Sequence, residues 1–175
     1  MKLDLETIIE QSLALLNEEG LEGFNLRALA KRLNVQAPAI YWHVKNKEEL
    51  FTLMANKIYQ RAYLSVSNAD DWREWLLIFG RSIHKEFLAF RDGPKLCAIA
   101  APASNAKEVS ENLAEPLVKL KIEKSTALSF QSAVIAYALG WSLYEQNEGY
   151  RNFLSELTTQ GNGFEIGLKA LVKGF

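Results

Sequence analysis

The chain has 175 residues, of which 49% are hydrophobic, and its formal net charge is −1 at pH 7. Such a chain can bury a core in one domain, or in one small and one larger domain. The near-neutral charge excludes a protein that coats nucleic acid over its whole surface, so any DNA contact must be local. The single cysteine, Cys97, excludes an internal disulfide framework and fits a reducing cytosol. No apolar run approaches the roughly 18 residues of a membrane span, so we expect a cytoplasmic protein without membrane contact.

The first predicted element is an amphipathic helix over residues 4–19. Asp4 is placed to cap it, and Gly20 is placed to end it. Its apolar residues recur at helical spacing and form one stripe, which we interpret as support for the segment that follows. The stripe consists of Leu5, Ile8, Ile9, Leu13 and Leu16.

Residues 25–50 have the pattern of a helix-turn-helix. Asn25 is a good cap for a short helix over residues 26–33, and a second short helix begins near Gln36. Pro38 falls in the first turn of that second helix, where a missing N–H costs little. Small side chains at Ala30 and Ala39 allow the two helices to cross closely. The second helix is then presented outward.

The same stretch is locally basic. No acidic residue occurs between Glu22 and Glu48, and three flat, polar-tipped side chains follow one another at residues 41–43. Cations interleaved with such side chains fit contacts to a sugar-phosphate backbone. The alternative is a small helical corner with a solvated basic face. The cations are Arg27, Lys31, Arg32, Lys45 and Lys47.

A further helix is predicted from Asn46 to Val66, with its N-terminus beside the helix-turn-helix. It is the natural mechanical connection to the rest of the chain. The polar stretch that follows marks a boundary. We therefore predict a helix-turn-helix DNA-binding domain over residues 1–48, a connecting helix over 49–66, and a C-terminal domain over 67–175.

The C-terminal part is predicted to be all-α. Two helices near the end carry apolar residues on more than one side, and a subunit interface and an ordinary core both explain them. The expected helices cover residues 72–90, 102–121, 125–147, 152–159 and 164–172, with a turn at 91–94 and a short apolar segment at 95–101.

Nothing in the sequence indicates an enzyme, a metal site or a cofactor. Asp70 and Asp71 form an acidic pair, but helix capping explains them better than metal binding. Cys97 and His84 are the only nucleophile–base pair, and no motif surrounds them. We expect His84 to be exposed or to cap a helix. There is no glycine-rich phosphate loop.

The runs LRALAKRLNV and AIYWHVKNKEEL resemble the DNA-binding domain of the TetR family of regulators, and within it the tetracycline repressor class. A weaker resemblance extends to the C-terminus. It implies an all-helical homodimeric repressor that binds a palindromic DNA operator and is released by a ligand. The resemblance also implies that residues 67–175 form an effector-binding and dimerisation domain. The dimer would form through the helices near residues 125–147 and 164–173.

The resemblance assigns DNA contacts position by position. Arg27 is the candidate for direct readout, because its fork can bond guanine O6 and N7. For Trp42, packing and DNA contact remain equally open. Ala37 and Ala39 replace a glutamine and a threonine, so we expect a different operator, with Gln36 contributing instead. The matching positions are Arg27, Pro38, Tyr41, Trp42, His43 and Lys47.

The effector site departs from the resemblance. Cys97, Ala101 and Leu113 stand where that class has a histidine, an arginine and a glutamine. An apolar, sulfur-bearing lining supplies poor ligands for Mg²⁺. We therefore expect a small hydrophobic effector and not a magnesium–tetracycline chelate. The candidate walls are Tyr63, Trp75, Phe79, Ile83, Cys97, Ala101, Pro102, Leu113, Phe130 and Trp141.

Other interpretations remain open. The same side chains could equally well fill a core. A filled core without a cavity favours a DNA-binding protein that is effector-independent or regulated by a protein partner. A purely structural helical dimer is a third possibility, and failure to bind any palindromic DNA favours it.

Overall fold

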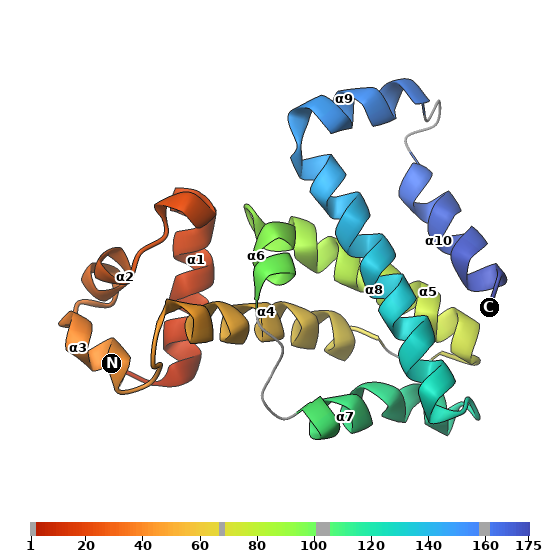
Figure 1. Cartoon of the computed structure of the whole chain (residues 1–175), viewed down its shortest axis with the longest axis horizontal. Helices are drawn as coiled ribbons and strands as arrows, with labels where there is room; N and C mark the ends of the chain where they lie inside the picture. Colours follow the sequence, from red (N-terminus) through yellow and green to blue (C-terminus); the bar gives the residue numbers. More distant parts are fainter. Residues whose placement is uncertain (1–2, 67–68, 101–105, 158–161) are drawn as a thin grey trace.

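The computed structural model describes residues 3–66, 69–100, 106–157 and 162–175, and every regular element in these ranges is a helix (Figure 1). This confirms the all-α prediction. The helices are α1 (Leu5–Gly23), α2 (Leu26–Leu33), α3 (Ala37–Tyr41), α4 (Lys47–Leu64), α5 (Trp72–Leu88), α6 (Gly93–Ile99), α7 (Ala106–Lys119), α8 (Lys124–Gln146), α9 (Glu148–Leu157) and α10 (Gly163–Lys173).

Helices α1, α2 and α3 form a small head at one end of the molecule, at the left of Figure 1. The carboxylate of Asp4 caps α1 by accepting the backbone N–H of Thr7 at 2.8 Å. Gly20 interrupts the helix with φ +70°, and Phe24 follows as a buried residue at its end. The break at Gly20 agrees with the predicted helix end, and α1 supplies the inner wall of the head.

Helix α4 leaves the head and runs along the C-terminal helices, so it contacts both α1 and α5 (Figure 1). The amide oxygen of Asn46 accepts the N–H of Glu49 at 2.8 Å, which fixes where α4 begins. Helix α4 thus contacts both the head and the C-terminal part, and its role as a mechanical connection stays a prediction.

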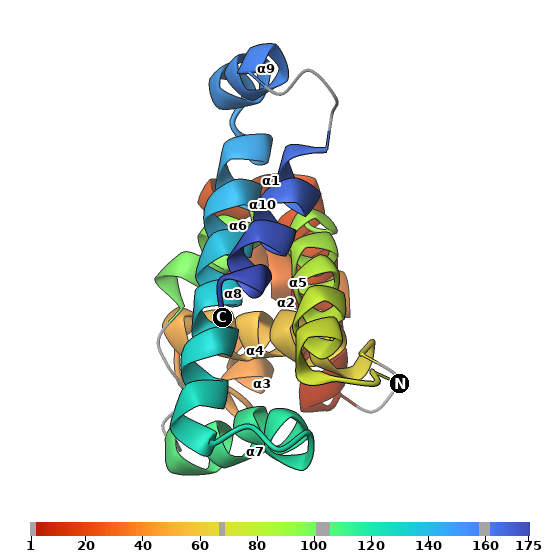
Figure 2. The ribbon, with the colours of Figure 1, turned by 90° about the vertical axis from the view of Figure 1, so that its right-hand side faces the viewer.

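Helices α5, α8 and α10 pack together as the centre of the C-terminal part (Figure 2). Gly80 makes this packing possible, because an added Cβ would lie 2.7 Å from Leu168 Cδ1. Gly167 similarly leaves room for the hydroxyl of Tyr137. Helix α9 continues beyond the end of α8, on the opposite side from α7 (Figures 1 and 2).

Some expected helix boundaries differ from the structure. Helix α6 covers residues 93–99. It therefore includes the second half of the expected turn and most of the expected apolar segment. Helix α8 begins at Lys124, because Glu123 accepts the N–H of Thr126 at 3.0 Å and serves as the cap. Helix α9 begins at Glu148, four residues before the expected start at residue 152. The expected start of the helix at Pro102 lies outside the described residues.

His84 is neither exposed nor a helix cap, so that prediction is wrong. Its Nε2 lies 2.7 Å from a carboxylate oxygen of Glu145, and only 17% of its side chain is exposed. Its ring also stacks on Phe164, with ring centroids 3.7 Å apart. Contacts from α8 and α10 decide this environment, and the sequence around His84 carries no sign of them. Among the described helices, none combines the length and the apolar content needed to cross a membrane.

Candidate nucleic-acid interface

Helices α2 and α3 are joined by a tight, hydrogen-bonded turn. Asn25 caps α2 by accepting the N–H of Ala28 at 2.9 Å. Asn34 ends α2 in the left-handed conformation with φ 55°, which asparagine tolerates better than most residues. The N–H of Val35 then bonds to the carbonyl of Ala30 at 3.0 Å. The turn thereby fixes α3 across α2, as in a helix-turn-helix.

The outer face of this motif carries large exposed side chains. Leu29 and Ile40 are fully buried and attach the two helices to the head. In contrast, Trp42 is 88% exposed and Tyr41 is 53% exposed. The Trp42 ring therefore does not pack within this chain, and its contact with DNA stays a prediction.

Most of the predicted contact residues lie on the surface. Arg27, on α2, and Gln36, at the start of α3, are both exposed. Ala37 and Ala39 are half-buried, and Pro38 between them is exposed. Four of these positions follow one another at the start of α3, and Arg27 lies in the first turn of α2. The remaining exposed position is His43.

Lys47 has a more internal position than the sequence indicates. Its ammonium donates to the carbonyl of Phe24 at 2.7 Å. It also lies over the rings of Phe24 and Phe51, 5.7 and 5.0 Å from their centroids. An ammonium has three N–H donors, so one bond to Phe24 leaves donors available. A phosphate contact by Lys47 therefore stays a prediction.

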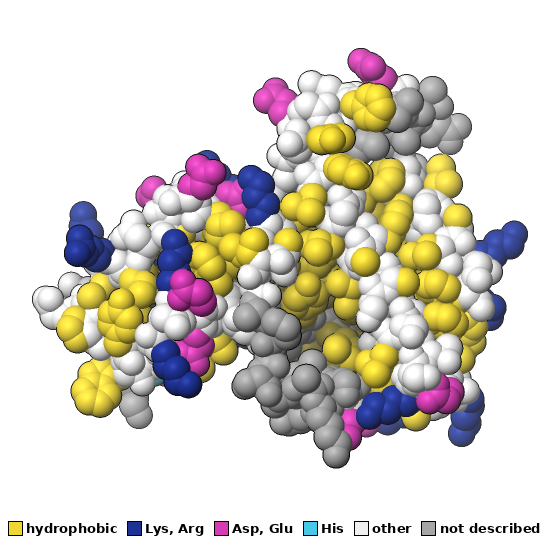
Figure 3. Space-filling view, in the orientation of Figure 1, with side chains coloured by type: hydrophobic (Ala, Val, Ile, Leu, Met, Phe, Trp, Pro, Cys, Tyr) yellow, Lys and Arg dark blue, Asp and Glu magenta, His cyan; other side chains and the backbone are white. Residues whose placement is uncertain are grey.

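Arg32 is engaged elsewhere and does not belong to the α3 surface. Its guanidinium pairs with Glu18 on α1 at 2.7 Å and bonds to Gln11 at 2.8 Å. Figure 3 shows Lys and Arg side chains and exposed hydrophobic side chains together on the head. The basic stretch of the sequence thus divides into a head-stabilising cation, Arg32, and cations such as Arg27 and Lys31 that face solvent.

The corner between α5 and α6 is fastened to the end of α1. Asp92, at φ 56°, accepts the N–H of Leu21 at 3.0 Å. The backbone N–H of Arg91 donates to the side chain of Asn17 at 2.7 Å. Burial disfavours ionisation of Asp92, but the Leu21 N–H and the Lys95 ammonium outweigh it and lower the pKa of its carboxyl. The head and the C-terminal part are therefore joined at a second place besides α4.

The candidate effector-site residues do not form one cluster. Tyr63, Trp75 and Phe79 do come together, with ring centroids 5.1 to 6.2 Å apart. Phe130 instead stacks between Trp72 and Phe175, at 5.3 and 4.2 Å.

The other candidate walls are dispersed or fully enclosed. Trp141 lies against Tyr137 and Phe164. Ile83 is fully buried, and burial raises the pKa of the Cys97 thiol to about 12. The thiol thus stays protonated and unreactive. Ala101 and Pro102 lie outside the described residues.

A groove of about 570 Å³ opens between α1, α4 and α7. Tyr63 and Leu113 are the predicted effector residues that line it. The Tyr63 hydroxyl donates to the backbone carbonyls of Asn112 and Leu113, at 2.7 and 3.2 Å. The sequence missed the other walls because they lie on different helices, and only the approach of those helices makes a groove. These walls are Glu6, Ile9, Leu53, Asn56, Lys57, Tyr59, Gln60, Leu64 and Asn112. No cluster of three potential metal-binding side chains occurs in the part of the chain that the structure describes.

An exposed helix-turn-helix on a small head, joined by a connecting helix to a larger helical bundle, defines a DNA-binding transcriptional regulator. Comparison with known proteins gives the family. Residues 8–54 match the family model for bacterial regulatory proteins of the tetR family, and residues 65–159 match that for the tetracyclin repressor-like C-terminal domain. The chain belongs to the TetR family of transcriptional regulators, which are not enzymes, and this confirms the predicted family and class.

The similarity extends to a characterised repressor and to solved structures. The tetracycline repressor protein class A from transposon 1721 of Escherichia coli is 35% identical over 147 residues, covering 83% of this chain and 68% of that protein. A TetR variant from Acinetobacter baumannii AYE, solved in complex with minocycline, is 32% identical with a TM-score of 0.77. That match covers 99% of this chain and 97% of the other. BioQ, solved with its double-stranded DNA operator, is 27% identical with a TM-score of 0.71, covering 99% and 98%.

Proposed function

We propose that this regulator is a repressor that binds a palindromic operator as a homodimer and is released by a small hydrophobic effector. The exposed surface of α2 and α3 is the observation that carries the proposal. Tyr41 and Trp42 are adjacent, exposed aromatic side chains beside solvent-facing cations, and aromatic residues and arginine are enriched where proteins meet partners. The operator-bound BioQ structure supports DNA as that partner.

Each contact residue has a proposed role in the operator complex. Arg27 reads a guanine through two hydrogen bonds to O6 and N7. Ala37 and Ala39 contact thymine methyl groups, and Gln36 bonds to a base edge, so the sequence read is this protein's own. The side chains that position the head on phosphates are Tyr41, His43 and Lys47, with Trp42 against the sugar-phosphate backbone.

The proposed dimer forms through α8 and α10. Ile166 on α10 is 59% exposed, and Tyr144 on α8 is 46% exposed. Gly140 on α8 has no atom within 4 Å of the position that a Cβ would take, so that place is open to a second helix. A two-fold arrangement of such helices sets two heads on successive half-sites of a palindrome.

The proposed effector is apolar and is not a magnesium–tetracycline chelate. Cys97 is a buried neutral thiol, and Leu113 offers only methyl groups. Neither provides the oxygen ligands that Mg²⁺ requires. Effector binding favours a state in which α4 is displaced, which changes the separation of the two heads.

A second candidate function has an observation in its favour. The close ring contacts of Tyr63, Trp75 and Phe79 are those of a filled core. They favour a regulator that needs no small effector or responds to a protein partner. A thermal-shift screen with hydrophobic compounds separates the two, because only a ligand-responsive protein gains stability with a compound that also weakens operator binding.

The DNA-reading surface is tested by Arg27→Ala against Lys85→Ala. Both remove one exposed cation, but Lys85 lies on α5, away from the head. On a duplex selected by the wild-type protein, we expect Arg27→Ala to lose about 10- to 100-fold in affinity, because one bidentate base contact is lost. Lys85→Ala should bind as wild type does. Equal, small losses in both variants would overturn the assignment of this surface.

A further inference from the structure

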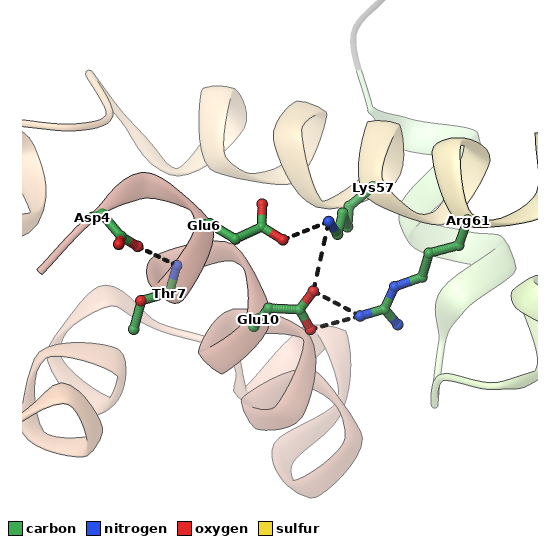
Figure 4. Close-up of polar contacts among 6 residues, drawn as sticks. All are labelled: Asp4, Glu6, Thr7, Glu10, Lys57 and Arg61. Atoms are coloured by element: carbon green, nitrogen blue, oxygen red, sulfur yellow. Dashed lines mark hydrogen bonds and ion pairs between the residues drawn. The ribbon is translucent and has the colours of Figure 1, made fainter. Parts of the chain in front are cut away.

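A ladder of ion pairs joins α1 to α4 (Figure 4). The ammonium of Lys57 lies 2.5 Å from a carboxylate oxygen of Glu6 and 3.8 Å from one of Glu10. One guanidinium nitrogen of Arg61 bonds to both carboxylate oxygens of Glu10, at 2.6 and 2.8 Å. Two cations on successive turns of α4 thus hold two acids on successive turns of α1.

Arg61 also contacts the C-terminal part of the molecule. Its guanidinium lies over the ring of Phe90, 5.4 Å from the centroid. The carbonyl of Phe90 in turn accepts a hydrogen bond from the side chain of Gln146, the last residue of α8, at 2.9 Å. One side chain therefore connects the support helix of the head, the connecting helix and the end of α5.

Ion pairs constrain this junction in a way that its apolar contacts do not. Buried aliphatic residues of α1 and α4, among them Ile8, Leu13 and Ile58, belong to one shared core. Hydrophobic burial is non-directional, so it tolerates small rotations and sliding of one helix on the other. Paired charges with fixed partners favour one register of the two helices.

Further bonds hold the far end of α1. The Asn17 and Leu21 contacts with Arg91 and Asp92 lie near the kink at Gly20, whereas the ladder lies near the N-terminus of the helix. Because α1 is attached near both of its ends, its orientation is fixed, whereas a single attachment would let the helix pivot. The ladder is the attachment that belongs to α4.

We propose that Lys57 and Arg61 are positioning residues for operator recognition. They fix the angle of the head on α4, and through that angle they fix the spacing of operator half-sites that the dimer accepts. Neither side chain contacts DNA in this account. The inference rests on the proposed function, because it requires a dimer that reads a palindrome.

The test compares operators of different spacing. Binding is measured for the full-length protein on the selected operator and on duplexes with one base pair added or removed between the half-sites. The ratio of affinities is the readout. We expect Arg61→Ala to reduce the preference for the selected spacing by about three- to tenfold. Arg61→Lys should reduce it less, because lysine keeps the charge but not the planar guanidinium that lies over Phe90.

The matched control is Glu18→Gln, which breaks the ion pair with Arg32 inside the head. Its spacing preference should equal that of the wild type. A purely structural loss would lower affinity for all spacings together and leave the ratio unchanged. The pairs are partly exposed, with 33% of Arg61 and 39% of Glu10 accessible, so these variants should still fold.

The strongest test exchanges the two charges of the Glu10–Arg61 pair. In the Glu10→Arg, Arg61→Glu protein, the new arginine faces the new glutamate, whereas the contacts of Lys57 with Glu10 and of Arg61 with Phe90 are lost. We expect this double variant to recover part of the spacing preference that Arg61→Glu loses. Unchanged ratios in every Arg61 variant, or no recovery in the double variant, would overturn the proposal. Failure of the wild type to select any palindrome would instead overturn the proposed function.

Discussion

The exposed indole of Trp42 is the most unusual single residue of this molecule. A side chain of this size normally buries most of its apolar surface, and this one remains 88% exposed. The backbone N–H of the next residue, His43, bonds to the carbonyl of Ile40 at 2.9 Å, so a tight turn presents the ring outward. The ring therefore contributes little to stability and is available to a partner.

Trp42→Ala should separate binding from folding. Because the ring makes almost no contact within the chain, we expect the free energy of unfolding to change by less than about 0.5 kcal/mol. Operator affinity should fall by about tenfold, since phosphate and sugar contacts position the head. Chemical denaturation and DNA titration measure the two quantities. A stability loss of several kcal/mol would show that Trp42 belongs to the core.

The residues of the site were predictable to the extent that their environment is local. Asn25 and Asn46 cap their helices as the sequence predicts, because a cap needs only a neighbour three residues away. The helix-turn-helix pattern of residues 25–50 also predicts that α3 faces outward. The bond of Lys47 to Phe24 and the pair between His84 and Glu145 depend on helices far away in the sequence. No local pattern could have predicted them.

Among the elements, the end of α1 depends on one glycine. Gly20 has φ +70°, and a Cβ there would lie 3.0 Å from both Arg91 Nε and Asp92 Oδ2. We expect Gly20→Ala to lower the free energy of unfolding by about 1–3 kcal/mol, from backbone strain and from crowding of this corner. Denaturant titration measures the loss.

Gly149→Ala is the matched control for this substitution. Gly149 has no positive φ, and an added Cβ would make an ordinary contact of 3.5 Å with Asn147. This variant should be as stable as the wild type or slightly more stable, because alanine favours a helix. Equal losses in the two variants would refute the special role of Gly20.

The contact of α5 with α10 should depend on pH. Two hydrogen bonds from Arg81, at 2.6 and 2.9 Å, lower the pKa of Glu165 from 4.5 to about 2. A carboxyl with a depressed pKa stabilises the fold above its ordinary pKa, and this contribution is lost as the pH falls from about 4.5 toward 2.

Arg81→Ala should therefore cost about 1 kcal/mol at pH 7, because the pair is partly exposed. The difference from wild type should shrink below pH 4 and vanish only below pH 2. Lys169→Ala removes a more exposed partner of the same carboxylate, 3.1 Å away, and should cost less. A difference for Arg81→Ala that persists unchanged at low pH would contradict the account.

The helices themselves were largely predictable, whereas their contacts were not. Apolar spacing and caps such as Asp71 indicate α1 to α5, because these signals lie within each helix. The start of α8 was misplaced, since Glu123 is an uncommon cap. The groove between α1, α4 and α7 required the assembled fold, because residues from three helices form it.

At the scale of the whole molecule, the head lies at one end, helices α8 and α10 lie toward the other, and α4 runs from the head toward them (Figure 1). The head is held by the ladder on one side and by the Asp92 corner on the other. In the proposed dimer, we expect such an arrangement to transmit a change in the C-terminal bundle to the separation of the two heads.

Ile166→Arg should test the proposed dimer. Ile166 is 59% exposed, so an arginine there is tolerated by the isolated chain. In a two-fold interface it places two like charges in an apolar contact, and we expect dissociation to a folded monomer. Sedimentation velocity gives the mass, and operator affinity should fall sharply. Lys85→Ala is the control, and an unchanged mass for Ile166→Arg would place the interface elsewhere.

Selection of bound duplexes from a random DNA pool, at several salt concentrations, tests the central claim most directly. The account predicts recovery of a palindrome, with affinity that falls steeply as salt rises because phosphate contacts release counterions. Arg27→Ala should fail to enrich the same palindrome. Weak binding to all sequences alike, with no enriched palindrome, would contradict the account.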